Sequence, residues 1–114
     1  MPKIKNEVRR GDLFWAKLDP TFGSELQKTR PVIILSITPL NTVRRTIIVV
    51  PLSTSAPEID FLNVALTGGS VARCEHTRAI DKSRLASKIG TISEVDMQKI
   101  EVGLSRILGI IARR

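Results

Sequence analysis

The chain has 114 residues, 42% of them hydrophobic, which predicts one domain over residues 1–114 that buries about two-thirds of its unfolded surface. Its formal net charge of +7 favours a polyanionic partner, which could be nucleic acid, an anionic membrane or an acidic protein segment, and charge alone does not choose among them. No apolar run is long enough for a signal peptide or a membrane span, and one cysteine with one histidine is too few for a disulfide or structural zinc, so we expect a cytoplasmic protein without metal or cofactor.

The first half of the chain contains three short apolar runs rich in β-branched residues, a pattern that predicts buried strands. These runs are residues 12–18, 32–37 and 46–52. The second half has three weaker strand patterns, with Gly68-Gly69 as a turn between the first two. They are residues 62–66, 70–75 and 87–92. Together the segments predict a mainly β fold, built as a barrel-like antiparallel sheet.

Polar segments connect the strands. The connection 19–30 is long for a hairpin, and a loop of this kind is where a rigid sheet tends to carry a binding site. The polar segments 38–45 and 53–60 are expected to be its counterparts. One short helical turn is expected around Leu85, after Asp81-Lys82.

The end of the chain has a helical period. Ser93 is a good N-cap, and hydrophobic residues then recur every three or four positions, which predicts a C-terminal helix. Gly103 and Gly109 fall inside this pattern and each weakens the helix by up to about 1 kcal/mol relative to alanine, so packing on the sheet must stabilise it. The periodic residues are Met97, Ile100, Leu104, Ile107, Leu108 and Ile111.

Three motifs near the start of the chain occur in a specific order. They are Arg10-Gly11-Asp12, Gly23-Ser24-Glu25 and Lys28-Thr29-Arg30-Pro31. With a later Arg73-Cys74-Glu75, they resemble the MazF/PemK/Kid family of bacterial endoribonuclease toxins, and the resemblance covers nearly the whole chain. It implies an SH3-like barrel of antiparallel strands with a C-terminal helix, a homodimer, and an acidic antitoxin protein whose flexible tail blocks the RNA groove.

The resemblance also implies a reaction. Members of this family are toxins of type II toxin–antitoxin systems that cut single-stranded RNA, here expected to be mRNA, at specific sequences and so inhibit translation and growth. Without a metal, such cleavage needs a base for the ribose 2′-hydroxyl, an acid for the leaving 5′-oxygen and a cation for the phosphate. The products are a cyclic phosphate and a 5′-hydroxyl.

Arg30 precedes a proline that favours extended backbone, and the resemblance implies that it contacts the scissile phosphate. Arg73 and Glu75 are two apart in a predicted strand, so they share a face, opposite Cys74 and His76. The resemblance implies that Arg73 is the general acid and Glu75 the general base, although Kid-like members have Asp in place of Glu75. That change moves the carboxylate outward by one methylene, which bears on the rate.

The remaining site residues follow from the same resemblance. Ser53, at a strand end, is expected to contact the substrate phosphate with its hydroxyl. His76 is assigned a binding or structural role because strand alternation separates it from Glu75. Cys74 is expected to be buried, and Asp81 and Arg84 are expected to form structural ion pairs. The residues expected to bind RNA are Ser24, Lys28, Thr54 and Arg78.

From the residues alone, other interpretations stay open. Arg30 fits a solvated loop, Arg73 with Glu75 fits a surface ion pair, and Ser53 fits a turn. Two other functions also remain as alternatives. A gyrase poison like CcdB shares the fold, but its C-terminal Trp-Gly-Ile has no counterpart here, where the sole tryptophan is Trp15. A non-catalytic RNA-binding barrel is kept open by the glutamate at position 75.

Overall fold

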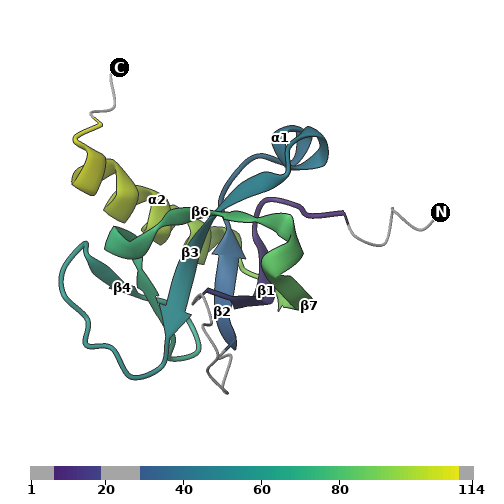
Figure 1. The fold of residues 1–114 in the computed structure, drawn as a ribbon. Coiled ribbons are helices and arrows are strands. Elements are labelled where there is room, and N and C mark those ends of the chain that lie inside the picture. Colours follow the sequence, from purple (N-terminus) through teal and green to yellow (C-terminus); the bar gives the residue numbers. More distant parts are fainter. Residues whose placement is uncertain (1–6, 19–28, 111–114) are drawn as a thin grey trace.

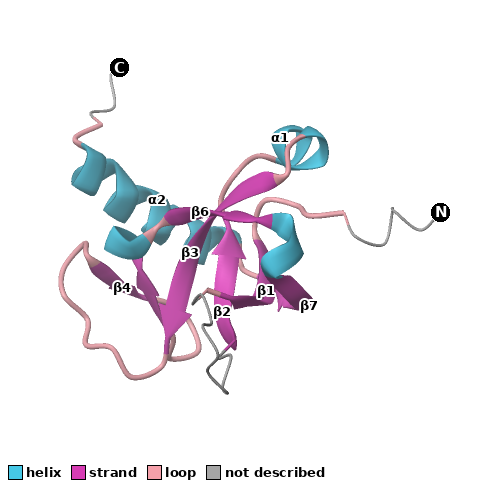
Figure 2. Cartoon of the chain, in the orientation of Figure 1, coloured by secondary structure: helices cyan, strands magenta, loops and turns pink. Residues whose placement is uncertain are grey.

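The computed structural model describes residues 7–18 and 29–110. Within these ranges the chain forms an antiparallel sheet of seven strands, accompanied by α-helices and 3-10 helices (Figures 1 and 2). The strands are β1 (Asp12–Lys17), β2 (Thr29–Ile34), β3 (Thr46–Ser53), β4 (Asn63–Ala65), β5 (Val71–Arg73), β6 (Arg78–Asp81) and β7 (Leu85–Thr91). The helices are α1 (Thr38–Val43), the 3-10 helices η2 (Cys74–His76) and η3 (Lys82–Arg84), and α2 (Glu94–Leu108).

Strand β3 is the centre of the sheet. The strand order is β4-β5-β3-β2-β1-β7, and β6 also pairs with β3. Because β3 is eight residues long, its two halves can bind different partners: residues 46–49 pair with β6, and residues 52–53 pair with β5. The η2 turn lies between β5 and β6 along the chain, at the point where β3 changes partner.

The sheet separates two hydrophobic clusters. One lies inside the curled sheet and is called the barrel cluster; the other lies between the sheet and α2 and is called the helix cluster. The barrel cluster consists of Val8, Phe14, Ala16, Leu18, Val32, Ile34, Ile47, Val49 and Ile80. The helix cluster consists of Ile33, Leu35, Val50, Leu52, Leu66, Ala72, Cys74, Met97 and Ile100. Strands β2 and β3 supply both clusters, which explains their continuous apolar runs.

The predicted strands and the C-terminal helix are confirmed, with five corrections. Residues 74–75 form η2 rather than strand, the predicted loop 38–45 contains α1, and β6 was not predicted. The helical turn expected around Leu85 is η3, which ends just before it, while Leu85 begins β7. Gly109 does not lie within the helix but ends it in the left-handed conformation, with φ 71°.

The beginning of α2 is fixed as predicted. The Ser93 hydroxyl oxygen accepts a hydrogen bond of 3.1 Å from the Asp96 backbone amide. The buried Asp96 carboxylate in turn accepts bonds of 3.0 Å from the backbone amide and the hydroxyl of Thr67, in the β4–β5 turn. These bonds attach the helix to the turn that carries β5.

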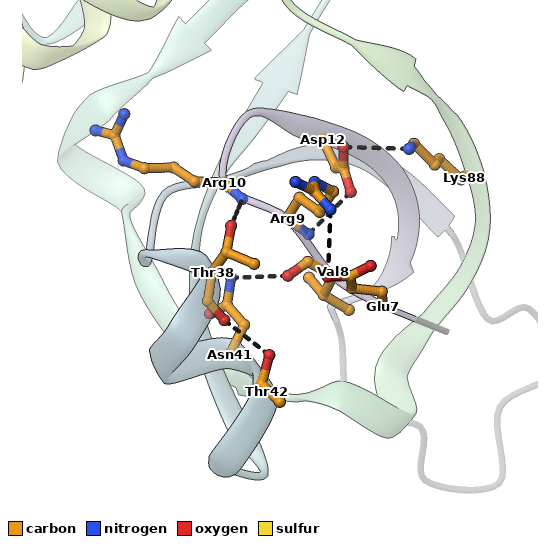
Figure 3. Close-up of polar contacts among 9 residues, drawn as sticks. All are labelled: Glu7, Val8, Arg9, Arg10, Asp12, Thr38, Asn41, Thr42 and Lys88. Atoms are coloured by element: carbon orange, nitrogen blue, oxygen red, sulfur yellow. Dashed lines mark hydrogen bonds and ion pairs between the residues drawn. The ribbon is translucent and has the colours of Figure 1, made fainter. Parts of the chain in front are cut away.

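The Arg10-Gly11-Asp12 turn joins three parts of the fold, and Figure 3 shows its contact with Lys88 of β7. Gly11 has φ 94°, a conformation that other residues rarely adopt. The buried Asp12 carboxylate accepts a bond from the Arg9 amide and pairs with Lys88 at 3.2 Å. The guanidinium of Arg10 donates to the carbonyl of Leu35 and pairs with Glu101 of α2 at 2.9 Å. The motif therefore orients β1 against β7 and α2.

Candidate active site

Two of the predicted site residues lie at the same end of the β2–β3 pair. Val32 is opposite Pro51 in this pair, and the strands continue from there to Arg30 on β2 and Ser53 on β3. By alternation Arg30 shares a face with Val32, and Ser53 shares a face with Val49, and both valines belong to the barrel cluster. Arg30 and Ser53 therefore project from the face of the sheet that is opposite α2.

Two further arginines project from that face. Arg73 follows Ala72 on β5, and because Ala72 belongs to the helix cluster, alternation turns Arg73 to the other side. Arg78 of β6 is directly opposite Val49, so the two side chains share a face. We call these four residues the arginine face: Arg30, Ser53, Arg73 and Arg78.

Arg30 is exposed and lies in the strand rather than in the loop before it. It pairs with Ala16 of β1, one position before Pro31. Since β2 begins at Thr29, one position earlier than Arg30, a regular strand fixes the backbone from which the guanidinium extends. This placement argues against a freely solvated loop arginine.

The Ser53 hydroxyl oxygen already acts as a hydrogen-bond acceptor within the protein. Its oxygen accepts hydrogen bonds from the backbone amides of Ser55 at 3.1 Å and Ala56 at 3.0 Å, which is the turn interpretation left open by the sequence. With the oxygen occupied in this way, the hydroxyl hydrogen remains to be donated. The turn and a phosphate contact are therefore compatible. Thr54 is exposed directly after β3, and Ser24 and Lys28 lie outside the described residues.

The predicted pairing of Arg73 with Glu75 on one strand face is wrong, because β5 ends at Arg73 and η2 begins at Cys74. The turn brings His76 back toward Arg73 instead. The distance from Arg73 Nη2 to His76 Nε2 is 3.0 Å, and that from His76 Nε2 to Glu75 Oε2 is 3.6 Å. The three side chains form one polar group, and the alternation argument that set His76 apart fails.

The Arg73 side chain is partly buried. Its Nε atom is buried and has no hydrogen-bond partner among the residues that the structure describes. Buried polar atoms are nearly always hydrogen-bonded, so this unpaired donor is an exception within the described fold. The other two members, Glu75 and His76, are both half-exposed and open to an incoming molecule.

Cys74 attaches the η2 turn to the helix cluster. Its side chain is buried as predicted, and burial raises the pKa of its thiol to about 11, so the thiol stays protonated at neutral pH. The Thr77 hydroxyl donates to the Cys74 carbonyl at 2.9 Å and closes the turn. The turn is therefore fastened on both sides of Glu75 and His76.

Helix α2 packs directly on η2 at Gly103. A Cβ atom at this buried position would lie 3.0 Å from the Phe61 carbonyl oxygen, 3.1 Å from Val64 Cγ2 and 3.2 Å from Cys74 Sγ. The glycine thus sets the distance between the helix and the turn that carries Glu75 and His76.

Replacing Gly103 with alanine is expected to destabilise the protein by about 1–2 kcal/mol. Overpacking costs roughly 1–3 kcal/mol, which exceeds the gain in helix propensity of up to about 1 kcal/mol. Urea unfolding measures the change. Val102→Ala, at the exposed neighbouring position, is expected to change stability by about 0.5 kcal/mol or less. A stabilised Gly103→Ala variant would show that the helix can move away from η2.

Asp81 and Arg84 are structural in different ways. The Asp81 carboxylate accepts a bond of 2.9 Å from the Ser83 amide and pairs with Arg45 at 3.5 Å, and these contacts lower its pKa. The ion pair predicted for Asp81 is thus present. Arg84 donates to the carbonyl of Lys17 at 2.9 Å, which is a hydrogen bond between β1 and η3 rather than the ion pair predicted.

Two features are absent from the described ranges. Residues 7–18 and 29–110 contain no group of three or more His, Cys, Asp or Glu side chains that could hold a metal ion. No helix in the same ranges is long and apolar enough to cross a membrane.

Comparisons with known proteins identify the relatives of this chain. The family model for the PemK-like, MazF-like toxin of type II toxin-antitoxin system matches residues 9–108. Endoribonuclease PemK of Escherichia coli is 34% identical, with 91% of this chain and 84% of that protein covered. Endoribonuclease EndoA of Bacillus subtilis (strain 168) is 32% identical, with 91% and 97% covered.

A solved structure shows the same fold. The MazE-MazF crystal structure (Form-II) from Deinococcus radiodurans superposes with a TM-score of 0.82 at 24% sequence identity, and the match covers 92% of this chain and 98% of that one. The family match spans far more than half of the sequence and includes all four residues of the arginine face. The chain therefore belongs to the PemK/MazF family of endoribonuclease toxins of type II toxin–antitoxin systems.

Proposed function

We propose that this toxin cleaves single-stranded RNA, and mRNA in particular, at specific sequences and without a metal ion. The ribose 2′-oxygen attacks the neighbouring phosphorus, and the products carry a cyclic phosphate and a 5′-hydroxyl. The arginine face is the observation that carries this proposal, because three strands direct guanidinium groups to one side of the sheet. Loss of intact mRNA then inhibits translation and growth.

The arginine face supplies the electrostatic part of catalysis. A guanidinium presents N–H donors in a rigid fork that matches phosphate oxygens, and it does so with a full positive charge. Arg30 contacts the scissile phosphate, and the free hydroxyl hydrogen of Ser53 donates to another oxygen of the same group. Arg73 donates toward the leaving 5′-oxygen, where negative charge grows in the transition state.

The proton from the 2′-hydroxyl passes to a base carried by the η2 turn. This turn carries Glu75, at the position of the family's carboxylate base, next to Arg73. Cys74 and Thr77 fix the turn, so that its base is held in one place relative to the arginine face.

The partners follow from charge and family. A chain with a net charge of +7 attracts both an RNA backbone and an acidic peptide, so we propose an acidic antitoxin of the MazE/PemI type that covers the arginine face. We further propose a single domain over residues 1–114 that acts as a homodimer in the cytoplasm. Ser24, Lys28, Thr54 and Arg78 remain the proposed RNA-binding residues outside the reacting centre.

The test uses antitoxin-free protein and a long RNA of known sequence in excess EDTA. We expect cuts at a small set of sequences, with a 5′-hydroxyl on one fragment and a cyclic phosphate on the other. A 2′-deoxy substitution at a mapped cut should abolish cleavage there, since it removes the nucleophile. Cleavage that requires added metal would contradict the mechanism, and binding of intact RNA by folded protein would indicate a non-catalytic barrel.

A further inference from the structure

The group formed by Arg73, Glu75 and His76 contains a proton carrier that the arginine face lacks. An arginine cannot be deprotonated in a protein, so Arg73 can donate hydrogen bonds but cannot take up a proton. Imidazole is the side chain that changes charge between about pH 5 and 8. His76 is the only histidine in the chain, and it lies 3.0 Å from Arg73.

We propose that His76 is the general base that takes the 2′-hydroxyl proton, with Glu75 acting through it. This inference rests on the proposed RNA cleavage and identifies the atom that receives the proton. The 2′-O–H bond breaks and its proton moves to Nε2 of His76, while the 2′-oxygen forms a bond to phosphorus. The P–O5′ bond then breaks, and the leaving 5′-oxygen takes a proton from water.

The contacts of Nε2 define two states of the histidine. Because Arg73 can only donate, Nε2 accepts its hydrogen bond in the neutral state, and the ring proton lies on Nδ1. Once Nε2 is protonated it can no longer accept from Arg73, and it faces Glu75 Oε2 at 3.6 Å. Proton uptake thus exchanges an Arg73 partner for a Glu75 partner.

This exchange couples proton transfer to charge stabilisation. When Nε2 takes the proton, the Nη2 group of Arg73 is released and can turn to the phosphate or the leaving oxygen at the moment when negative charge grows there. The Glu75 carboxylate stabilises the imidazolium that has formed. Glutamate suits this role, because its extra methylene need not place the carboxylate on the 2′-hydroxyl itself.

Charged groups on several elements act on the histidine. Arg73 from β5 disfavours the imidazolium, while Glu75 of η2 favours it. These neighbours have opposite effects on the imidazolium. Removing the arginine and removing the glutamate are therefore expected to shift the pH profile in opposite directions.

The test compares kcat/KM against pH for wild type, His76→Gln and Glu75→Gln on a short RNA with one cut site. Glutamine at 76 can still accept from Arg73 and donate to Glu75, but it cannot take up a proton in this pH range. We expect His76→Gln to lose at least about 10²-fold and to lack the rise in rate between about pH 5 and 8. Glu75→Gln should keep the rise, with its midpoint at lower pH.

A second substrate distinguishes a variant that lacks the general base from one that lacks the general acid. In a 5′-phosphorothiolate RNA the leaving sulfur needs no proton, so a variant that lacks the acid recovers its rate and one that lacks the base does not. We expect the His76→Gln deficit to persist. A recovered rate would overturn the assignment, and so would a rise that disappears in Glu75→Gln but stays in His76→Gln. An inactive wild type would overturn both proposals, whereas an active wild type matched by His76→Gln would overturn this one alone.

Discussion

Arg30→Ala is expected to reduce RNA cleavage by about 10³-fold or more and to leave the fold intact. Loss of a single preorganised donor to a developing oxyanion costs about 10²–10³-fold, and Arg30 contributes both a donor fork and a full charge. The side chain is exposed at the start of β2, so its removal opens no cavity in either hydrophobic cluster. Single-turnover cleavage at the mapped cut, together with the thermal unfolding midpoint, measures both effects.

Two further variants show whether position or charge accounts for the loss. Arg30→Lys keeps the charge but not the fork, and we expect an intermediate rate. Lys99→Ala removes one positive charge from the exposed side of α2, which packs on the opposite face of the sheet, and we expect a rate close to that of wild type. An equal loss in Lys99→Ala would mean that net charge, and not the arginine face, drives cleavage.

Binding can be measured apart from chemistry. With a 2′-deoxy nucleotide at the cut, Arg30→Ala should weaken binding and reduce the slope of log K against log salt by about 0.7, the value for one phosphate contact on a single strand. The loss in cleavage is expected to exceed the loss in affinity, because the guanidinium binds the transition state more tightly than the ground state. Equal losses in cleavage and in affinity would mean that Arg30 contributes only to binding of the ground state.

The strands next to both clusters were predictable because their signal is strong. Ile33 and Val50 pack against α2, while Val32 and Val49 pack inside the barrel, so β2 and β3 are apolar on both faces. Continuous β-branched runs of this kind have few other interpretations. The C-terminal helix also has a strong signal in the sequence, because Ser93 is its N-cap and marks where its first turn begins.

The elements that were not predicted leave little local signal in the sequence. Strand β6 is recognisable only through its pairing with β3, which sets Ile80 opposite Ile47. The η2 turn has no glycine or proline to mark it, and only the Thr77 hydroxyl, bonded to the Cys74 carbonyl, signals that the strand ends. A strand at this point predicts that Arg73 shares a face with Glu75 and not with His76, whereas the η2 turn brings His76 to Arg73.

The sequence therefore named four residues of the candidate site, but it did not group His76 with them and did not give their geometry. Arg30, Ser53, Arg73 and Glu75 were chosen by resemblance, and their roles stay predictions. What the sequence could not supply was the register that turns Arg30 and Ser53 to one face, or the 3.0 Å contact between Arg73 and His76. Register depends on which strands pair, and that choice is made by the whole sheet.

Helix α1 was missed for a similar reason, and the residue that holds it gives the largest expected effect on stability. Asn41 is fully buried. Its Nδ2 donates to the carbonyls of Val8 at 3.2 Å and Ser36 at 2.9 Å, and its Oδ1 accepts from the Ser36 hydroxyl (Figure 3 shows the bond to Val8). One amide thus joins α1 to the segment that precedes β1 and to the β2–α1 connection.

Asn41→Ala is expected to lower the free energy of unfolding by about 2–4 kcal/mol, because it leaves two buried carbonyls without this donor and the Ser36 hydroxyl without its acceptor. Urea unfolding measures this loss. Thr42→Ala, at the exposed neighbouring position of the same helix, should cost about 0.5 kcal/mol or less. Equal losses in the two variants would mean that α1 contributes by helix formation alone.

Asn41→Asp adds a dependence on pH that tests the same network. A carboxylate facing two carbonyls in a buried site is disfavoured, so the folded-state pKa of the new aspartate should rise above its unfolded value of about 3.9. The stability deficit relative to wild type is then smallest below that unfolded value and grows as the pH rises through the folded-state value. A deficit that is constant from pH 4 to 8 would mean that water reaches position 41, and that the hydrogen bonds of α1 contribute much less to the fold than their burial indicates.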